Sequence, residues 1–541
     1  MADTNLTWYK DAIFYEVYIR AFNDGNGDGH GDLIGLTEKL DYFKELGVDC
    51  LWLSPMYPSP LRDDGYDISD YYNIHPDYGT LDDFKKLIAE AKQRGIRIIT
   101  DLVMNHTSDL HPWFQESRSS KDNPKRDWYV WSDTDDLYTE TRIIFLDTEP
   151  SNWTYDEVAG QYFWHRFYRT QPDLNWDNPE VIEEFKNIAR FWLDLGLDGF
   201  RADAVPYLIE RDHTSNENLP ETHEILKDFR AFMDEEFPGT ILLGEANMWP
   251  WDLRPYFANG DEFQMCFHFP VMPRLFMAVK KGEVSDVIDI MQRTPDIPAN
   301  CQWCTFLRNH DELTLEMVTE EDRQWMWEQY APEERMRLNL GIRRRMAPLL
   351  DNDRRKLELL NVVLFSLPGS PILYYGDEIG MGDNIWLFDR NGVRTPMQWE
   401  DAPNAGFSAA KETYAPVIDD ANYGYSKVNV DNALADEHSL WHWTKQLIAM
   451  RKEHPAFSRG SYEFIETDNP AVLALLRKSE EETILALANF SDQEQVAKIP
   501  LPDYAAHEKI ELFSQIPHGC KEEVHRTLLE PYEYQWLLMK E

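Results

Sequence analysis

The amino-acid sequence predicts an α/β fold, a (β/α)8 TIM barrel that carries an inserted subdomain after its third strand and a C-terminal β-sandwich. Three observations support this prediction. Strand-like apolar stretches alternate with segments of helical periodicity up to about residue 375. The segment 104–176 is too irregular for one crossover and is rich in tryptophan. Short alternating segments appear after about residue 456.

The first helix–strand pair illustrates the pattern. We expect Thr37 to cap a helix that carries Leu40 and Phe43 on one face, and Gly47 to end it. The apolar stretch around Cys50 then predicts a strand.

The same signals recur twice. Thr80 and Gly95 bound a predicted helix before the strand at 97–103. Asn178 and Gly196 bound another before the strand at 199–203. Continuing in this way gives eight candidate strands, near residues 12–19, 50–54, 97–103, 199–203, 241–245, 263–269, 303–309 and 371–375.

We therefore expect three units. The catalytic barrel takes residues 1–103 and 177–455, the inserted subdomain takes 104–176, and the C-terminal β-sandwich takes 456–541. A second insertion at about 312–356 is charged and predicted to be largely helical.

The net charge of the chain restricts the classes of partner that it can bind. The chain has 53 Lys and Arg against 97 Asp and Glu, a formal net charge of -44. Such a field repels phosphate backbones and anionic lipids, so it argues against nucleic acid and membrane partners. No apolar run reaches the roughly 18 residues that span a bilayer. The polar start of the sequence lacks a signal-peptide core, and we expect a cytoplasmic protein.

The five cysteines do not suggest a disulfide framework. Cys301 and Cys304 form one CxxC motif, but a structural zinc needs a second pair or histidines. We expect these cysteines to be buried free thiols.

Polar residues concentrate where the predicted strands end. Asp203, Glu245 and Asp311 follow three different strands and should converge at the carboxyl end of the barrel. Such carboxylates repel one another unless the chemistry uses them. Retaining glycosyl transfer uses an ionised carboxylate as nucleophile and a protonated one as acid. Arg201 lies two residues before Asp203 on the same strand face and would keep it ionised.

Four short segments, DLVMNH, GFRADAV, GEA and NHDE, stand in order at these strand ends. In them the chain resembles the α-amylase superfamily of glycoside hydrolases. The resemblance implies that Asp203 is the nucleophile, Glu245 the acid/base, and Asp311 a stabiliser of the transition state. It also implies that His106, Arg201 and His310 hold the sugar at the reacting subsite.

Longer runs are similar to one family in this superfamily, the trehalose synthases. They include DAVPYLIERDHTSNENLPETH, FHFPVMPRLFMA and GDNIWLFDRNGVRTPMQW. This similarity implies intramolecular glucosyl transfer that interconverts maltose and trehalose, with minor hydrolysis to glucose. The alternative is an α-glucosidase that resembles oligo-1,6-glucosidase and uses the same catalytic set. A non-enzymatic binding module is a third class, which should lack the catalytic carboxylates.

The family pattern also implies contacts to the substrate. Asp63 would bind the terminal glucose hydroxyls, Tyr66 would stack on the ring, and Gln171 would add a contact. Arg394 would pair with Asp63 and close the pocket to one glucose unit, which favours a disaccharide over a polymer. The alternative for Arg394 is a purely structural salt bridge.

Two structural metal sites are expected, the first for calcium and the second for a metal ion of open identity, and no organic cofactor is expected. The family pattern implies one between barrel and subdomain, with ligands from Asn105, Asp173 and Glu210 and from the carbonyls of Tyr207 and Leu208. The second is the loop DGNGDGHGD, which begins like a calcium loop but lacks its closing glutamate, so an ordinary turn is the alternative. Its ligands would be Asp24, Asn26, Asp28 and Asp32. We also expect a homo-oligomer.

Overall fold

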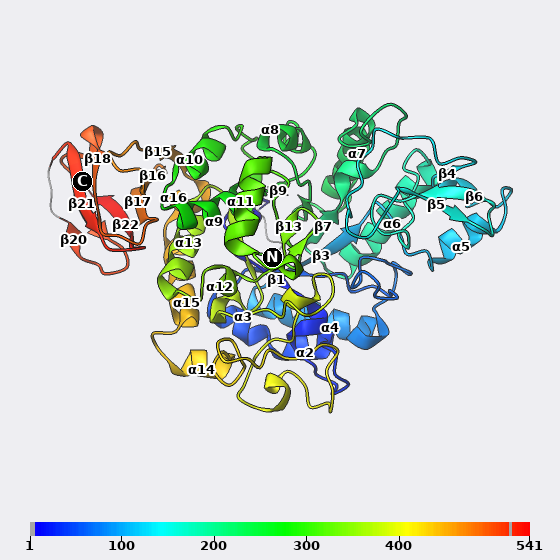
Figure 1. Ribbon diagram of the computed structural model, residues 1–541, viewed down its shortest axis with the longest axis horizontal. Helices are drawn as coiled ribbons and strands as arrows, with labels where there is room; N and C mark the ends of the chain where they lie inside the picture. Colours follow the sequence, from blue (N-terminus) through cyan, green and yellow to red (C-terminus); the bar gives the residue numbers. More distant parts are fainter. Residues whose placement is uncertain (1–5, 519–521, 541) are drawn as a thin grey trace.

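A computed structural model describes residues 6–518 and 522–540 and confirms the predicted barrel (Figure 1). Eight parallel strands close in the order β1-β14-β10-β9-β8-β7-β3-β2. Each predicted strand is present, with ends shifted by a few residues. The strands are β1 (Phe14–Val17), β2 (Cys50–Leu53), β3 (Arg97–Val103), β7 (Gly199–Asp203), β8 (Ile241–Gly244), β9 (Met265–Phe267), β10 (Gln302–Phe306) and β14 (Ser370–Tyr374).

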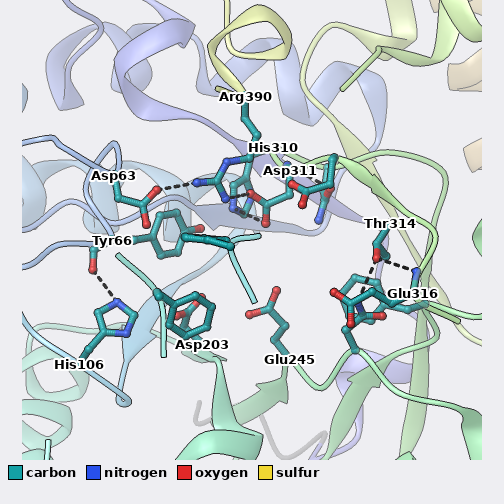
Figure 2. Close-up of a pocket in the computed structure, with 16 residues that line it drawn as sticks. Asp63, Tyr66, His106, Asp203, Glu245, His310, Asp311, Thr314, Glu316 and Arg390 are labelled. Carbon is teal, nitrogen blue, oxygen red and sulfur yellow. Dashed lines mark hydrogen bonds and ion pairs between the residues drawn. The ribbon is translucent and has the colours of Figure 1, made fainter. Parts of the chain in front are cut away.

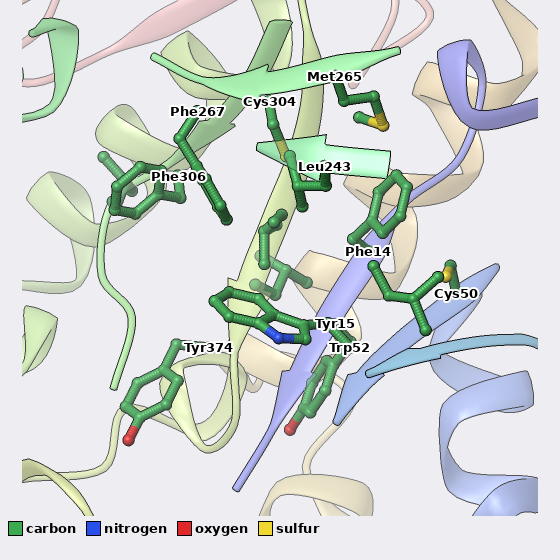
Figure 3. Packing of buried hydrophobic residues seen from close by; sticks show 14 of the residues in the cluster. Phe14, Tyr15, Cys50, Trp52, Leu243, Met265, Phe267, Cys304, Phe306 and Tyr374 are labelled. Carbon is green, nitrogen blue, oxygen red and sulfur yellow. The ribbon is translucent and has the colours of Figure 1, made fainter. Parts of the chain in front are cut away.

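Large side chains fill the barrel (Figure 3). Trp52, Phe267 and Phe306 are buried, and the Phe267 ring contacts Trp52 at a tilt and Phe306 edge to face. Truncating one such ring to alanine costs about 3–5 kcal/mol, because the surrounding core closes the cavity only in part. This packing gives the strand ends a rigid base.

Helices surround the barrel, and their ends follow the expected caps with one exception. Gly47 and Gly95 adopt left-handed conformations at helix ends, and Thr80 forms a capping box with Asp83. The prediction that Thr37 caps a helix is wrong, because its hydroxyl bonds the Leu33 carbonyl inside a helix. The main helices are α2 (Leu33–Glu38), α3 (Leu40–Leu46), α4 (Leu81–Arg94), α6 (Pro179–Asp194), α7 (Pro220–Glu236), α9 (Val271–Lys281), α10 (Ser285–Gln292), α13 (Arg354–Ser366) and α15 (Leu440–Glu453).

The subdomain after β3 lies at one side of the barrel (Figure 1). Its sheet has the order β4-β6-β5. Two isolated bridges, His106 to Asp173 and Tyr129 to Leu174, join the start and the end of the insertion. The elements are β4 (Trp131–Ser132), β5 (Trp153–Asp156), β6 (Gln161–Trp164) and α5 (Pro112–Ser119).

The insertion after β10 is mixed, so the prediction of a largely helical segment is only partly right. One helix, α11 (Glu320–Tyr330), is present, but a small antiparallel sheet lies beside it. Strands of two residues show no periodicity from which they could be predicted. The sheet consists of β11 (Leu313–Thr314), β12 (Arg337–Leu338) and β13 (Gly341–Ile342).

The C-terminal part folds as two facing antiparallel sheets, of six and two strands. Leu485, Ile499 and Leu529 pack between these sheets as a separate apolar core. The strands are β15 (Ser461–Phe464), β16 (Val472–Lys478), β17 (Thr483–Asn489), β18 (Gln495–Pro500), β19 (Glu508–Glu511), β20 (Pro517–His518), β21 (Val524–Leu529) and β22 (Tyr534–Lys540).

Over the described residues, every helix is too short or too polar to cross a membrane. Cys301 and Cys304 are buried free thiols, as are Cys50 and Cys266. Cys520 lies outside the described residues.

Candidate active site

A pocket opens at the carboxyl ends of the barrel strands, where the predicted catalytic carboxylates converge (Figure 2). Asp203 ends β7, Glu245 follows β8, and Asp311 follows β10. Side chains from the inserted subdomain complete the wall. The lining residues are Asp63, Tyr66, His106, Phe145, Phe167, Asp203, Glu245, Asn247, Phe269, Asn309, His310, Asp311, Glu312, Thr314, Glu316 and Arg390.

Arg201 joins three acids beneath this pocket. Its Nη1 lies 2.5 Å from Asp203 Oδ1 and also contacts Asp101, while its Nη2 lies 2.6 Å from Glu245 Oε1. The guanidinium is buried, so its charge is little screened by solvent. One fixed cation therefore holds Asp203 and Glu245 side by side.

The two carboxyls differ in acidity. Burial raises the pKa of Asp203 to about 6, although Arg201 opposes this shift. Burial raises the pKa of Glu245 to about 7, with Arg201 opposing and the Asp203 charge adding to the rise. Over the interval between these values, an ionised Asp203 coexists with a protonated Glu245.

Asp311 stands in a cationic setting. Its Oδ1 lies 2.8 Å from Arg390 Nη1 and 3.1 Å from Arg394 Nη2, and its Oδ2 lies 3.2 Å from His310 Nε2. Burial alone would raise the pKa of Asp311, but these three partners hold it well below its usual range. Asp311 is thus a fixed negative charge in the pocket.

Asp63 is buried, but its partner differs from the prediction. Its Oδ1 lies 2.6 Å from Arg390 Nη2, whereas Arg394 pairs with Asp64 at 2.9 Å. The two arginines lie four residues apart in one irregular segment, where sequence spacing gives no direction to a side chain. Gln171 donates to the other oxygen of Asp63 at 2.8 Å and is buried behind it.

Tyr66 and His106 line the pocket on the same side as Asp63, across from Glu245 and Glu316 (Figure 2). The Tyr66 ring stacks on His310 with centroids 5.2 Å apart. His106 Nε2 lies 3.2 Å from the Tyr66 carbonyl, and burial lowers the His106 pKa to about 3. A neutral His106 donates from Nε2 to that carbonyl and keeps its orientation without adding charge.

Ion pairs link the subdomain to the barrel loops at the mouth. Arg142 of the subdomain lies 2.9 Å from Glu217 and 3.1 Å from Glu316. The backbone N–H of Asn339 donates to Asp147 at 2.8 Å. A second cavity is lined by Arg142 and Glu217 and shares Asn247 and Glu316 with the pocket. These ion pairs therefore hold the subdomain against the barrel loops at the edge of the pocket.

Three oxygens predicted to bind calcium are buried without a hydrogen-bond partner. They are Asn105 Oδ1, Asp173 Oδ2 and Glu210 Oε1. Burial and the Asp173 charge raise the pKa of Glu210 well above its usual range, and burial raises that of Asp173 to about 8. Unsatisfied buried acceptors are costly, and a hard cation would satisfy them. Tyr207 ends a short 3-10 helix and Leu208 follows it, just before Glu210.

The loop at 24–32 is arranged differently. Asp24 accepts from the N–H groups of Gly27 and Gly29 at 2.6 and 2.7 Å. Asn26 and Asp28 each accept from the N–H two residues onward, and Asp32 caps α2. These bonds stabilise the turn by themselves, so the second metal site stays a prediction.

Several residues of the site were not predicted from the sequence. Arg390 stands in the quoted run GDNIWLFDRNGVRTPMQW, and Asp101 in DLVMNH, but neither received a role. Glu16 on β1 and Arg142 in the subdomain carried no motif. For Glu16, the signal was a glutamate within a predicted apolar strand. A charged side chain that is buried in this way needs a partner, which points to a functional or structural ion pair.

The family models agree with this architecture. The catalytic domain of alpha amylase matches residues 16–338 and 336–460. The C-terminal domain of maltogenic amylase matches residues 462–536.

Comparison with individual relatives indicates to which family within the α-amylases the chain belongs. The trehalose synthase/amylase TreS of Mycolicibacterium smegmatis is 53% identical, over 99% of this chain and 93% of its own. An oligo-1,6-glucosidase of Parageobacillus thermoglucosidasius is 34% identical, over 97% and 98%. The crystal structure of the trehalulose synthase MutB, mutant A258V, is 30% identical, with a TM-score of 0.80 over 98% of this chain and 100% of its own. The chain belongs to the α-amylase family and, within it, to the trehalose synthases.

Proposed function

We propose that the protein isomerises maltose and trehalose by transferring a glucosyl group within one bound disaccharide, with a little hydrolysis to glucose. The observation that carries this proposal is the set of contacts of Arg201, which fixes Asp203 and Glu245 together in the pocket. Arg142 of the subdomain pairs with Glu316 of the pocket lining beside them. The 53% identity to a trehalose synthase/amylase, against 34% to an oligo-1,6-glucosidase, favours the isomerase over the hydrolase.

In the first step, an oxygen of Asp203 attacks the anomeric carbon of the bound glucosyl unit. The bond to the leaving oxygen breaks as Glu245 donates its proton there, which gives a glucosyl ester and one glucose. Arg201 keeps Asp203 ionised, and the higher pKa of Glu245 keeps its proton available. Asp311, held ionised by its cationic partners, faces the positive charge that develops on the sugar.

In the second step, the released glucose turns and attacks through its anomeric hydroxyl. Glu245, now ionised, takes the proton from that hydroxyl, and the ester bond to Asp203 breaks. Two inversions leave the transferred unit with its original α configuration. Asp63, bonded to Arg390 and Gln171, is placed to bind the glucosyl unit that stays on Asp203.

We expect kcat/KM for maltose to follow a bell-shaped pH profile with its maximum between about pH 6 and 7. Activity falls below about pH 6 as Asp203 gains a proton, and above about pH 7 as Glu245 loses its proton. Initial rates at low substrate concentration from pH 4.5 to 9 measure this profile. A rate that stays flat from pH 5 to 8.5 would contradict the assigned pair.

Incubation with maltose separates the candidate functions. Trehalose as the main product supports the isomerase, and glucose as the sole product supports the α-glucosidase. Unchanged maltose would leave only a binding module, against which the three converging carboxylates argue.

We further propose a structural calcium ion between barrel and subdomain, held by Asn105, Asp173, Glu210 and the carbonyls of Tyr207 and Leu208. The support is the three buried oxygens without a partner, which suit a hard cation. The ion would neutralise the two acids and tie the end of β3 to the subdomain. It takes no part in the reaction.

Removing this ion is expected to lower the thermal unfolding temperature by several degrees, because a ligand that binds only the folded state stabilises it. Unfolding scans with and without EDTA measure the effect, and added Ca²⁺ should restore it. The Asp173→Asn variant should show a smaller response. If unfolding is unchanged by chelation and no calcium co-purifies, this site does not hold the ion.

A cytoplasmic location belongs to the same proposal. Its support is the set of four unpaired thiols, at Cys50, Cys266, Cys301 and Cys304, since free cysteines are typical of reducing compartments. The homo-oligomer stays a prediction.

A further inference from the structure

Glu16 is a charged residue inside the barrel wall. It lies on β1 and is 1% exposed. Its Oε1 lies 2.5 Å from His310 Nδ1 and also accepts from the His310 backbone N–H at 3.4 Å. On the far side of the ring, His310 Nε2 lies 3.2 Å from Asp311 Oδ2. Glu16, His310 and Asp311 thus form a line from the barrel wall into the pocket.

Among the described residues, the acceptor at His310 Nδ1 is Glu16, and aromatic rings pack against the imidazole. Tyr66 stacks on one side at 5.2 Å, and Trp52 meets the ring edge to face at 5.7 Å. Arg394 bonds the His310 carbonyl, and Asp101 is near enough for the imidazolium charge to lower its pKa. A ring with a carboxylate at each nitrogen donates from both, so it carries a positive charge.

We propose that Glu16 is a positioning residue of the reaction, whose carboxylate keeps His310 doubly protonated and directs its Nε2–H into the pocket beside Asp311. Glu16 lies outside the lining of the pocket and acts through His310 alone. His310 then presents a cationic donor to a sugar hydroxyl at the same place where Asp311 presents an acceptor. This inference rests on the proposed glucosyl chemistry.

The pKa of His310 agrees with this geometry. Burial would lower the pKa of His310, but Asp311 and Glu16 together raise it to about 9. The protonated state of His310 therefore predominates below about pH 9 and is lost as the pH rises through that value. Removing one facing charge shifts a pKa by about 1–3 units, so loss of the Glu16 charge should bring this titration towards neutral pH.

The test is Glu16→Gln, which keeps the shape and an acceptor for Nδ1 but removes the charge. We would measure kcat/KM for an activated aryl α-glucoside against pH, in a Glu245→Gln background where the acid no longer titrates. The alkaline limb should move down by about 1–3 pH units. Glu16→Asp, which retains the charge, should restore the limb even where the rate is lower.

Two controls distinguish the positioning role of Glu16 from a general effect of removing a buried carboxylate. Glu378 is an equally buried carboxylate that accepts from Tyr15 and Tyr42 away from the pocket, so Glu378→Gln should leave the limb in place. In a His310→Gln background, Glu16→Gln should cause no further loss.

An unmoved alkaline limb in Glu16→Gln, or additive losses in the double variant, would overturn the inference. Failure of the unmodified enzyme to process maltose would instead refute the proposed function. The two failures are therefore distinguishable.

Discussion

Asp203→Asn is expected to lower kcat for maltose by at least about 10⁴-fold, which corresponds to about 5.5 kcal/mol of lost transition-state stabilisation. The amide cannot form the glucosyl ester, so the double displacement stops at its first step. The side chain keeps its size beneath the pocket, and the fold should survive. Initial rates on maltose and on an aryl α-glucoside measure the loss.

Asp198→Asn is the matched control for this experiment. Asp198 precedes the same strand, β7, at its opposite end, and its Oδ1 lies 2.9 Å from Arg97 Nη1. Its loss should affect stability but leave kcat within a few-fold. A folded Asp203→Asn enzyme with near-normal turnover would exclude Asp203 as the nucleophile.

Glu245→Gln is expected to lower kcat/KM for maltose by about 10²–10⁴-fold, the usual contribution of general acid catalysis. An activated aryl α-glucoside needs little protonation of its leaving group, so its first step should survive nearly unchanged. The glucosyl ester should then accumulate, because Glu245 is also the base of the second step. A burst of released phenol followed by slow turnover would show this accumulation.

Added azide provides the internal control, since this anion attacks the ester without a general base. It should accelerate turnover of the aryl substrate by Glu245→Gln and should do nothing for Asp203→Asn. Equal losses with activated and natural substrates would contradict the acid role.

The fold and the convergence of Asp203, Glu245 and Asp311 in one pocket could be predicted because both follow local rules. Helix caps and apolar periodicity located all eight strands, and side chains that follow parallel strands must meet at one end of a barrel. The helix start at Thr37 was wrong because Asp32, five residues earlier, caps first.

Contacts between side chains in irregular segments could not be predicted from the sequence. Arg390, not Arg394, meets Asp63, and both lie in the same loop after β14. The ion pair beside the pocket joins Arg142 and Glu316, which are 174 residues apart and belong to two insertions. Such pairings depend on the path of long loops, for which no periodicity exists.

We expect the shielding of the pocket from water to decide between transfer and hydrolysis. Glucose released in the pocket meets the ester at a high effective concentration, as in intramolecular reactions. Water competes at about 55 M, so transfer prevails only while the pocket excludes it. The ion pairs of Arg142 with Glu217 and Glu316 are the contacts that tie the subdomain to the barrel loops beside the pocket. Arg142→Ala is therefore the variant in which we expect glucose to escape and exchange.

The most direct measurement runs unlabelled maltose with carbon-labelled glucose in the medium and analyses the first trehalose formed. Intramolecular transfer predicts trehalose almost without label in the unmodified enzyme, and a measurable labelled fraction in Arg142→Ala. Label in the trehalose of the unmodified enzyme at the fraction present in free glucose would mean that the glucose leaves the pocket between the two steps. That result would contradict transfer within one bound disaccharide.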